Sequence, residues 1–221
     1  MKEKVTSCIR YIVCENGKLE FFVLLSLLYL FSAIVVNEYI LVDELYYRSL
    51  GDQVSLTVID QMISLTNKWQ WLGYVSIPVI LALKFLLLST FLSMGALIAG
   101  HLLTFRQIFA IIMIAEMVYL ASGLISTGSI IISDVSTLED LNISILSLAS
   151  LVQESEIEPF LYYPLKSISI FLLIYILLIA HCYNIITGYS FRNAVHLVLS
   201  TCGTAFILWN ILVMYLLISY A

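Results

Sequence analysis

Residues 69–133 read WQWLGYVSIPVILALKFLLLSTFLSMGALIAGHLLTFRQIFAIIMIAEMVYLASGLISTGSIIIS, and this stretch decides the fold. Its charged side chains are Lys84, Arg106 and Glu116. A helix that spans a bilayer needs about 20 predominantly apolar residues, and no soluble core needs so long a nearly uncharged run. The stretch therefore predicts two consecutive transmembrane helices with a short turn at Arg106.

The composition of the whole chain points to the same environment. The 221 residues are 62% hydrophobic and 11% charged, with a mean hydropathy of +1.03. Soluble domains are about 45–50% apolar and about 25% charged. The net charge of -5 argues against nucleic acid as a partner. The expected partners are the lipid bilayer and other membrane proteins or a second copy of the chain.

The apolar residues are spread along the chain in blocks, which predicts an all-α integral membrane helical bundle with five transmembrane helices. The first run continues without a small-residue cleavage site, so we expect a retained span. Residues 1–18 are expected to form a cytoplasmic interfacial helix, and residues 19–221 a single five-span domain. The expected spans are 19–42, a run that ends near residue 103, 107–133, 160–186 and 193–220.

The distribution of lysine and arginine predicts the orientation of the spans. Basic residues cluster before the first span and at the turns that contain Arg106 and Arg192, whereas loop 43–68 is acid-rich and loop 134–158 has six acids and no base. Cytoplasmic loops carry the excess of positive charge. We therefore expect the N-terminus inside and the C-terminus outside, in a bacterial cytoplasmic (inner) membrane.

Both outside loops carry helical patterns, which predicts extracytoplasmic amphipathic helices. Residues 136–139 form a capping-box sequence, and apolar side chains then recur at three- and four-residue steps. A weaker version covers residues 52–66. Such helices either lie on the bilayer or cap the bundle, or they meet a partner protein. The predicted apolar face consists of Leu138, Leu141, Ile145, Leu148 and Val152.

The second apolar run is too long for one perpendicular span. Residues 72–105 would extend ~50 Å as one helix, against ~30 Å of hydrocarbon. Counting from the cytoplasmic turn places Lys84 near the outer interface, where a long side chain can snorkel. The residues before it would form an outer extension or an interfacial helix, with a kink at Pro78.

Glu116 is the sharpest candidate for a functional side chain. It lies ten residues past Arg106, so ~15 Å into the membrane, where an ionisable group is costly and often marks a pathway. One interpretation is a site that couples to protons or cations. The other is a structural carboxyl that is hydrogen-bonded inside the bundle, for example to Tyr119, Ser93 or Asn210. Contact with Lys84 would need a tilted or kinked helix, because the two residues differ in expected depth by ~10 Å.

The two cytoplasmic turns resemble each other, because Phe105 and Arg106 in one match Phe191 and Arg192 in the other. Each turn places a capping residue before a helix start, and Gly188 suits the position after a helix end. Spans two and three and spans four and five are either parallel repeats of one helical hairpin, or they share these residues because any short cytoplasmic turn favours a capping residue and a positive charge.

Few residues suggest catalysis. His101, His181 and His196 lie at similar depth and could in principle ligate a metal, but their spacing favours interfacial polar residues. Serine-elbow, zinc-protease and nucleotide-binding patterns are missing from the sequence. We therefore expect a non-enzymatic protein without a catalytic residue, metal or cofactor.

Residues 84–218 resemble the Yip family of small five-span membrane proteins and its bacterial relatives. The resemblance rests on the number of spans, the expected orientation and the turn at residues 188–194, GYSFRNA. It implies a non-enzymatic helical bundle that acts as an accessory or scaffold subunit of a membrane protein complex. The alternatives are a small proton- or cation-coupled transporter or channel that uses Glu116, and an intramembrane enzyme, which the missing catalytic set disfavours.

Overall fold

A computed structural model describes residues 9, 11–13, 17–51, 54–133, 146–151 and 159–220. In this part of the chain five apolar helical segments are long enough to cross a bilayer, and no strand is present. The protein is therefore an all-α, multi-pass membrane protein, as the sequence predicts. The five segments are Lys18–Tyr39, Leu56–Ile98, Phe105–Ile132, Ile170–Thr187 and Phe191–Ser219.

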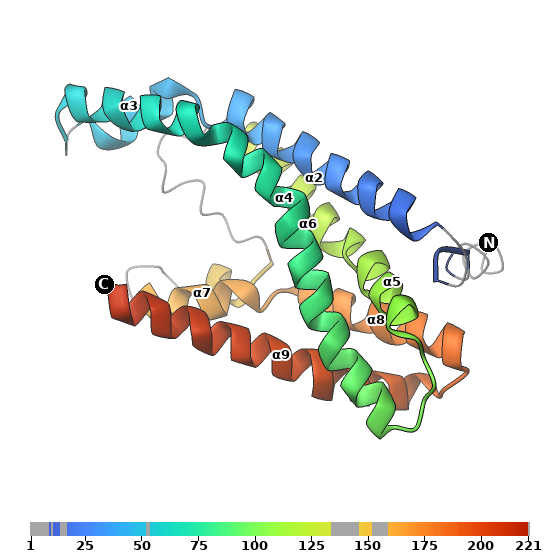
Figure 1. Cartoon of the computed structure of the whole chain (residues 1–221). Coiled ribbons are helices and arrows are strands. Elements are labelled where there is room, and N and C mark those ends of the chain that lie inside the picture. Colours follow the sequence, from blue (N-terminus) through green and yellow to red (C-terminus); the bar gives the residue numbers. More distant parts are fainter. Residues whose placement is uncertain are drawn as a thin grey trace.

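The segments alternate in direction, so the molecule has two distinct ends (Figure 1). One end holds the two short turns that follow α4 (Leu56–Ile98) and α8 (Ile170–Thr187), and the N-terminus lies there. We call it the turn end. The opposite end, which we call the hairpin end, holds the connection from α3 (Asp43–Leu50) to α4 and the C-terminus.

Helix α4 is longer than a bilayer is thick, and it forms the hairpin with α3. Its 43 residues extend ~65 Å, so its first turns project beyond the other spans. It runs continuously past Pro78 and bends along its length (Figure 1). The sequence left open an outer extension of the span or a separate interfacial helix. The structure shows the extension, as part of the same helix.

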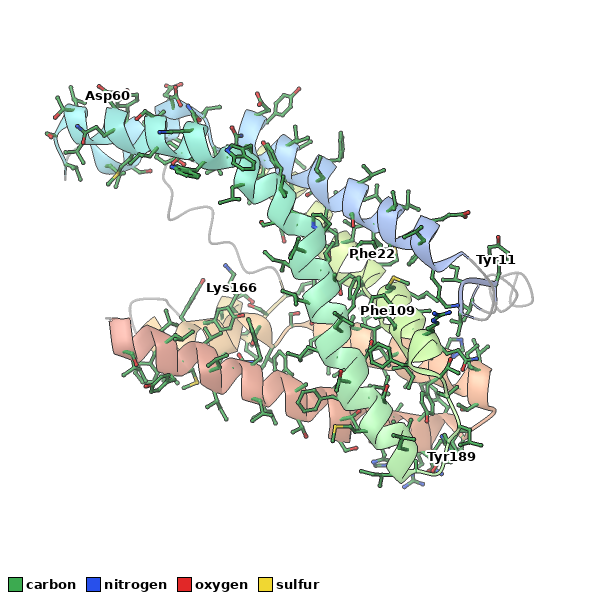
Figure 2. The ribbon with its side chains drawn as sticks, viewed as in Figure 1. Tyr11, Phe22, Asp60, Phe109, Lys166 and Tyr189 are labelled. Carbon is green, nitrogen blue, oxygen red and sulfur yellow. The ribbon has the colours of Figure 1, made fainter. Side chains whose placement is uncertain are left out.

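Packing and one hydrogen bond hold α3 against the start of α4. Leu45, Ile59 and Ile63 are buried between the two helices. The Tyr47 hydroxyl donates to the Asp60 carboxylate at the far tip of the hairpin (Figure 2). This hydrogen bond raises the pKa of Tyr47 above its usual value. Helix α3 is thus packed on α4 and hydrogen-bonded to it.

Helix α5 (Phe105–Ala115) lies at the centre of the bundle. Six of its 11 residues are buried, and it contacts α4, α8, α6 (Met117–Ile132) and α2 (Lys18–Tyr39). Helix α2 lies at the edge, since Leu25 is its one buried residue. The ring of Phe85 on α4 meets Phe22 of α2 edge-on at 6.2 Å and Phe109 of α5 at 5.8 Å (Figure 2). These aromatic contacts tie the edge helix to the core.

The predicted fourth span, 160–186, is wrong at its start. The structure divides the segment into α7 (Pro159–Ser167) and α8, which begins at Ile170. Ser169 caps α8 by accepting a hydrogen bond from the Leu172 amide at 3.4 Å. Ser169 also forms an isolated antiparallel bridge with Ser147. The break coincides with a short polar stretch, Lys166-Ser167-Ile168-Ser169, between two apolar runs. Ser169 is a residue type that caps helices, so the sequence carried a signal for the break that the averaged hydropathy of the span conceals.

The predicted α-helix over residues 137–152 can be compared with the structure at residues 146–151, and there it is wrong. Leu148–Leu151 form a 3₁₀ helix, η2, and Leu146 before it has a positive φ of 57°. The bridge from Ser147 to Ser169 holds the chain in an irregular path that an α-helix could not follow. Leu148 is 40% exposed, so it does not lie in a covered apolar face. The other four members of that face, Leu138, Leu141, Ile145 and Val152, lie outside the described residues.

Helix α9 (Phe191–Tyr220) closes the bundle against α4, α8 and α7. It packs closely on α4 at Gly95, where an added Cβ would lie 2.2 Å from the Thr201 Cγ2. The predicted N-terminal helix is described only at residues 9 and 11–13, which are helical. Ile9 and Val13 are buried against the core, so this part of the segment packs on the bundle.

Candidate functional site

Glu116 stands at the only interruption of the third apolar segment. Helix α5 ends at Ala115 and α6 begins at Met117, so Glu116 joins two helices whose run would otherwise be continuous. Its amide donates to two carbonyls, of Ile112 at 3.1 Å and Met113 at 3.2 Å. The residue is 1% exposed. The carboxyl therefore enters the middle of the bundle from an irregular point of the backbone.

Two side chains from other spans bind the same oxygen of this carboxyl. The Lys84 ammonium donates to Glu116 Oε1 at 2.6 Å, and the Tyr29 hydroxyl donates to it at 2.9 Å. The three residues come from α4, α2 and the junction of α5 with α6. We call this arrangement the polar clasp. It links three spans through one carboxylate oxygen.

The partners of Glu116 differ from those expected from the sequence. Asn210 accepts a hydrogen bond from Ser167 at 2.9 Å instead, and the buried Ser93 hydroxyl has no hydrogen-bond partner among the described residues. The expected obstacle to contact with Lys84 is removed because α4 bends and crosses its neighbours steeply (Figure 1). A tilted helix descends less per residue than an upright one, so Lys84 reaches the level of Glu116.

Two aromatic rings surround the ammonium group of Lys84. It lies 4.4 Å from the ring centroid of Tyr119 and 5.9 Å from that of Tyr175. The two rings contact each other at 4.9 Å between centroids. An ammonium group over the face of an aromatic ring is attracted by the ring's quadrupole, so these rings help to hold the end of the Lys84 side chain in place. Tyr119 thus acts through Lys84 and not as a direct partner of Glu116.

The second oxygen of Glu116 differs from the first in its surroundings. Its Oε2 is buried without a hydrogen bond among the described residues, and the same holds for the Tyr175 hydroxyl. The hydroxyls of Ser26, Ser89 and Ser93 share this property. Buried polar atoms usually have a partner, so the interior next to the clasp has the capacity to hold a proton or a water molecule.

Lys84 also lines a cavity that reaches from the clasp toward the hairpin end. This cavity, which we call the lysine cavity, has a volume of about 360 Å³ and contains a second lysine, Lys166 of α7. Figure 2 shows Lys166 on the side of α7 that is turned away from α9. The cavity therefore joins the intramembrane carboxyl to the end region of the bundle through the side chain of Lys84.

The turns that contain Phe105, Arg106, Phe191 and Arg192 lie together at the turn end, as the alternation of spans requires (Figure 1). Thr104 and Gln107 form a capping box at the start of α5. Gly188 ends α8 with a φ of 70°, as predicted, and Gly100 follows α4 with a φ of 76°. Each turn thus relies on one left-handed glycine, a conformation that other residues adopt at a cost.

One contact between the two turns was not predicted. His101 Nδ1 and the Tyr183 hydroxyl are 2.6 Å apart, and the His101 ring meets Tyr189 edge-on at 4.3 Å. His181 contacts the ring of Phe191 at 6.4 Å. Within the described residues no group of three histidine, cysteine or acidic side chains could hold a metal ion.

Tyr29 is the member of the clasp that the sequence analysis missed. A signal for it was present, because Tyr29 lies 11 residues past Lys18 and Glu116 lies ten past Arg106. Both distances correspond to ~15 Å of helix from the turn end. Matching the depths of polar residues across spans would have identified the pair.

Comparisons with family models, curated proteins and solved structures found no match. The fold and the clasp define the class directly: a small five-span α-helical membrane protein with an ion pair buried between its spans.

Proposed function

We propose that the protein is a non-enzymatic accessory or scaffold subunit of a membrane protein complex. The observation that carries the proposal is the polar clasp. Its intramembrane carboxylate is matched by a lysine of the same chain at 2.6 Å and by a tyrosine hydroxyl at 2.9 Å. A charge that is neutralised within its own bundle fastens helices together, which is a structural use of an ionisable residue.

The projecting start of α4 supplies a surface for a partner. Met62, Leu65, Trp69 and Leu72 follow one another at steps of three and four residues, and their exposed fractions lie between 43% and 56%. They form a single face of the helix. Ile59 and Ile63, on the adjoining side of the helix, are buried where α4 packs on α3. A partner helix that covers this exposed stripe would bury an apolar seam of the kind that drives helix association outside the membrane.

The orientation follows from the positive-inside rule. Lys18, Arg106 and Arg192 belong to the turn end, whereas the helices that precede the acid-rich segments, α2 and α6, end at the opposite end. The proposal places the turn end in the cytoplasm and the hairpin outside, in a bacterial inner membrane. The resemblance to the Yip family stays a prediction that agrees with a non-enzymatic bundle.

The test compares complexes purified in mild detergent from cells that carry the wild type or Leu65→Asp, after cross-linking of intact membranes. A charge in the middle of the stripe should remove specific cross-linked proteins, since an unpaired charge in an apolar contact is costly. Thr57→Asp, at an exposed position of the same helix, is the control and should keep them. Cross-linked proteins that are identical for the wild type and Leu65→Asp would contradict the scaffold proposal.

A second candidate, a small proton- or cation-coupled transporter, is favoured by Oε2 of Glu116, which is buried without a hydrogen bond to any residue that the structure describes. It is tested in proteoliposomes that contain a trapped pH indicator, under an imposed potential. Proton flux that Glu116→Gln abolishes and Glu20→Gln leaves intact would establish it, since Glu20 is an exposed acid outside the clasp. Flux equal to that of protein-free vesicles would remove it.

A further inference from the structure

The exposed stripe on the start of α4 continues as a regular repeat along most of the helix. From Met62 onward its positions follow one another at alternating steps of three and four residues, which is the seven-residue repeat of a coiled coil. We call this series the seam, and its members are Met62, Leu65, Trp69, Leu72, Ser76, Val79, Leu83, Leu86 and Thr90. All of them are exposed except the half-buried Ser76, and none carries a charge.

The repeat is informative where α4 projects beyond the other spans (Figure 1). Lipid requires apolar side chains at every exposed position of a span, whereas water does not. In residues 61–72 the seam is apolar, and the exposed positions outside it are Gln61, Ser64, Thr66, Asn67, Lys68 and Trp71. Trp71 is the exception, and tryptophan concentrates at membrane interfaces. A narrow apolar seam between polar positions is the pattern of a helix that pairs with one other helix.

The seam is open to a helix from outside the bundle. Within the span, the buried side of α4 includes Leu81 and Phe85, and Phe85 lies about 200° around the helix from Leu83 of the seam. In the projection, α3 covers the side that contains Ile59 and Ile63 and leaves the seam exposed. A further helix can therefore pack along the seam without displacing α3 or the neighbouring spans.

The charges along α4 suit a second copy of this chain. Two copies inserted in the same orientation are related by an axis along the membrane normal, so their α4 helices run parallel and equal residues meet at the same depth. The seam has no charge that would meet its own equivalent. Beside the seam, Lys68 is the charged residue at a flanking position, and in a parallel pair it faces Gly73 of the second copy. Like charges are therefore kept apart.

We propose that α4 pairs with α4 of a second copy through the seam, as a parallel coiled coil that begins in the projection and continues into the bilayer. The inference rests on the proposed function, because it names the partner of the same exposed stripe. Outside the membrane, removal of the apolar side chains from water drives the pairing. Inside it, the unbroken register lets the two helices stay in contact through van der Waals packing.

Disulfide cross-linking in native membranes tests the seam. Single cysteines are introduced as Leu65→Cys and Leu72→Cys in the full chain with Cys8→Ser and Cys14→Ser, and the two other cysteines are buried. A disulfide needs two Cα atoms within ~7 Å, which equal positions of a parallel seam provide, so an oxidant should convert both variants to covalent dimers. Asn67→Cys, exposed on the opposite side of the helix, is the matched control and should stay monomeric.

A charge placed in the seam supplies a second comparison. Leu65→Asp added to Leu72→Cys should abolish the covalent dimer, because an unpaired charge in an apolar contact is costly. Asn67→Asp added to Leu72→Cys should leave the yield unchanged. If Leu65→Asp lowers the amount of folded protein in the membrane, the single-cysteine variants decide. Equal cross-linking at Leu72 and Asn67, or none at either seam position, would overturn the inference.

The two proposals about this stripe can fail separately. Cross-linked products that join the wild type to other proteins, without covalent dimers at the seam cysteines, would keep the scaffold function and overturn self-association. Covalent dimers at the seam, without any other cross-linked protein, would support self-association and contradict the scaffold function.

Discussion

At the scale of single residues, the polar clasp is the feature that most distinguishes this bundle from five generic apolar helices. One carboxylate oxygen of Glu116 receives both Lys84 and Tyr29, so replacing the acid affects three spans at once. The lysine keeps 36% of its side chain exposed, whereas the acid keeps 2%. The pair is therefore buried on one side only.

The clasp predicts a strong coupling between its two charges. Glu116→Gln should lower the free energy of unfolding by about 2 kcal/mol, less than the ~3–5 kcal/mol of a fully buried pair because Lys84 is partly exposed. Adding Lys84→Met to that variant should restore much of the loss, since no unpaired charge remains. Denaturant titration of the wild type, the two single variants and the double variant in detergent micelles measures this double-mutant cycle.

The exposed pair of Glu44 and Arg48 is the control for this cycle. It has the same 2.6 Å separation as the clasp, but its side chains are 69% and 58% exposed. Exposed ion pairs contribute about 0–1 kcal/mol, so Glu44→Gln should leave the unfolding curve almost unchanged. Additive effects of the two clasp substitutions would show that the ion pair has no structural role.

Close packing at Gly95 supplies a second test at this scale. Gly95→Ala should destabilise the contact of α4 with α9, because the new Cβ collides with the Thr201 Cγ2. Thr201→Ser removes that methyl group and should rescue Gly95→Ala. Gly73→Ala, where nothing lies within 4 Å, should be neutral or slightly stabilising. Thermal unfolding of the four proteins in detergent checks this, and a Gly95→Ala protein as stable as wild type would contradict the close approach of the two helices.

At the scale of the elements, the apolar runs predict the existence of the spans and much less about their starts and tilts. The third segment, Phe105–Ile132, can be predicted from the sequence because it is long and apolar enough to cross a bilayer. The break between α7 and α8 falls at a short polar stretch, residues 166–169, that the apolar runs on both sides outweigh in any average over the span. A long-range bridge from Ser169 to Ser147 also lies at this break, and local sequence does not predict it. The contact of Lys84 with Glu116 depends on the bend of α4, which hydropathy does not encode.

The turn after α8 gives the prediction that belongs to this scale. Gly188→Ala should lower the free energy of unfolding by about 1 kcal/mol, because Gly188 has a φ of 70°, where a Cβ is strained. Gly203→Ala, inside α9 with open space around it, should raise stability slightly because alanine favours helices. Thermal unfolding measures both, and equal effects would show that the turn does not require a left-handed residue.

At the scale of the whole molecule, the alternation of five spans places the two termini at opposite ends (Figure 1). The two short turns share one end, and the α3–α4 hairpin shares the other with η2 and α7. The number of spans follows from sequence length and hydropathy. Which end faces the cytoplasm is a proposal that rests on the charge distribution alone, and the proposed outside position of the hairpin depends on it.

Cysteine accessibility tests this orientation most directly. In a chain whose Cys8 and Cys14 are replaced by serine, single cysteines are introduced as Leu102→Cys and Ser190→Cys at the two turns, and as Thr57→Cys and Leu151→Cys at the hairpin end. All four positions are exposed, and the remaining Cys182 and Cys202 are buried. We predict that a membrane-impermeant maleimide labels the hairpin-end pair in intact cells and the turn pair only after the membrane is opened. Labelling of either turn position in intact cells, or protection of both hairpin-end positions, would contradict the five-span account with its turns in the cytoplasm.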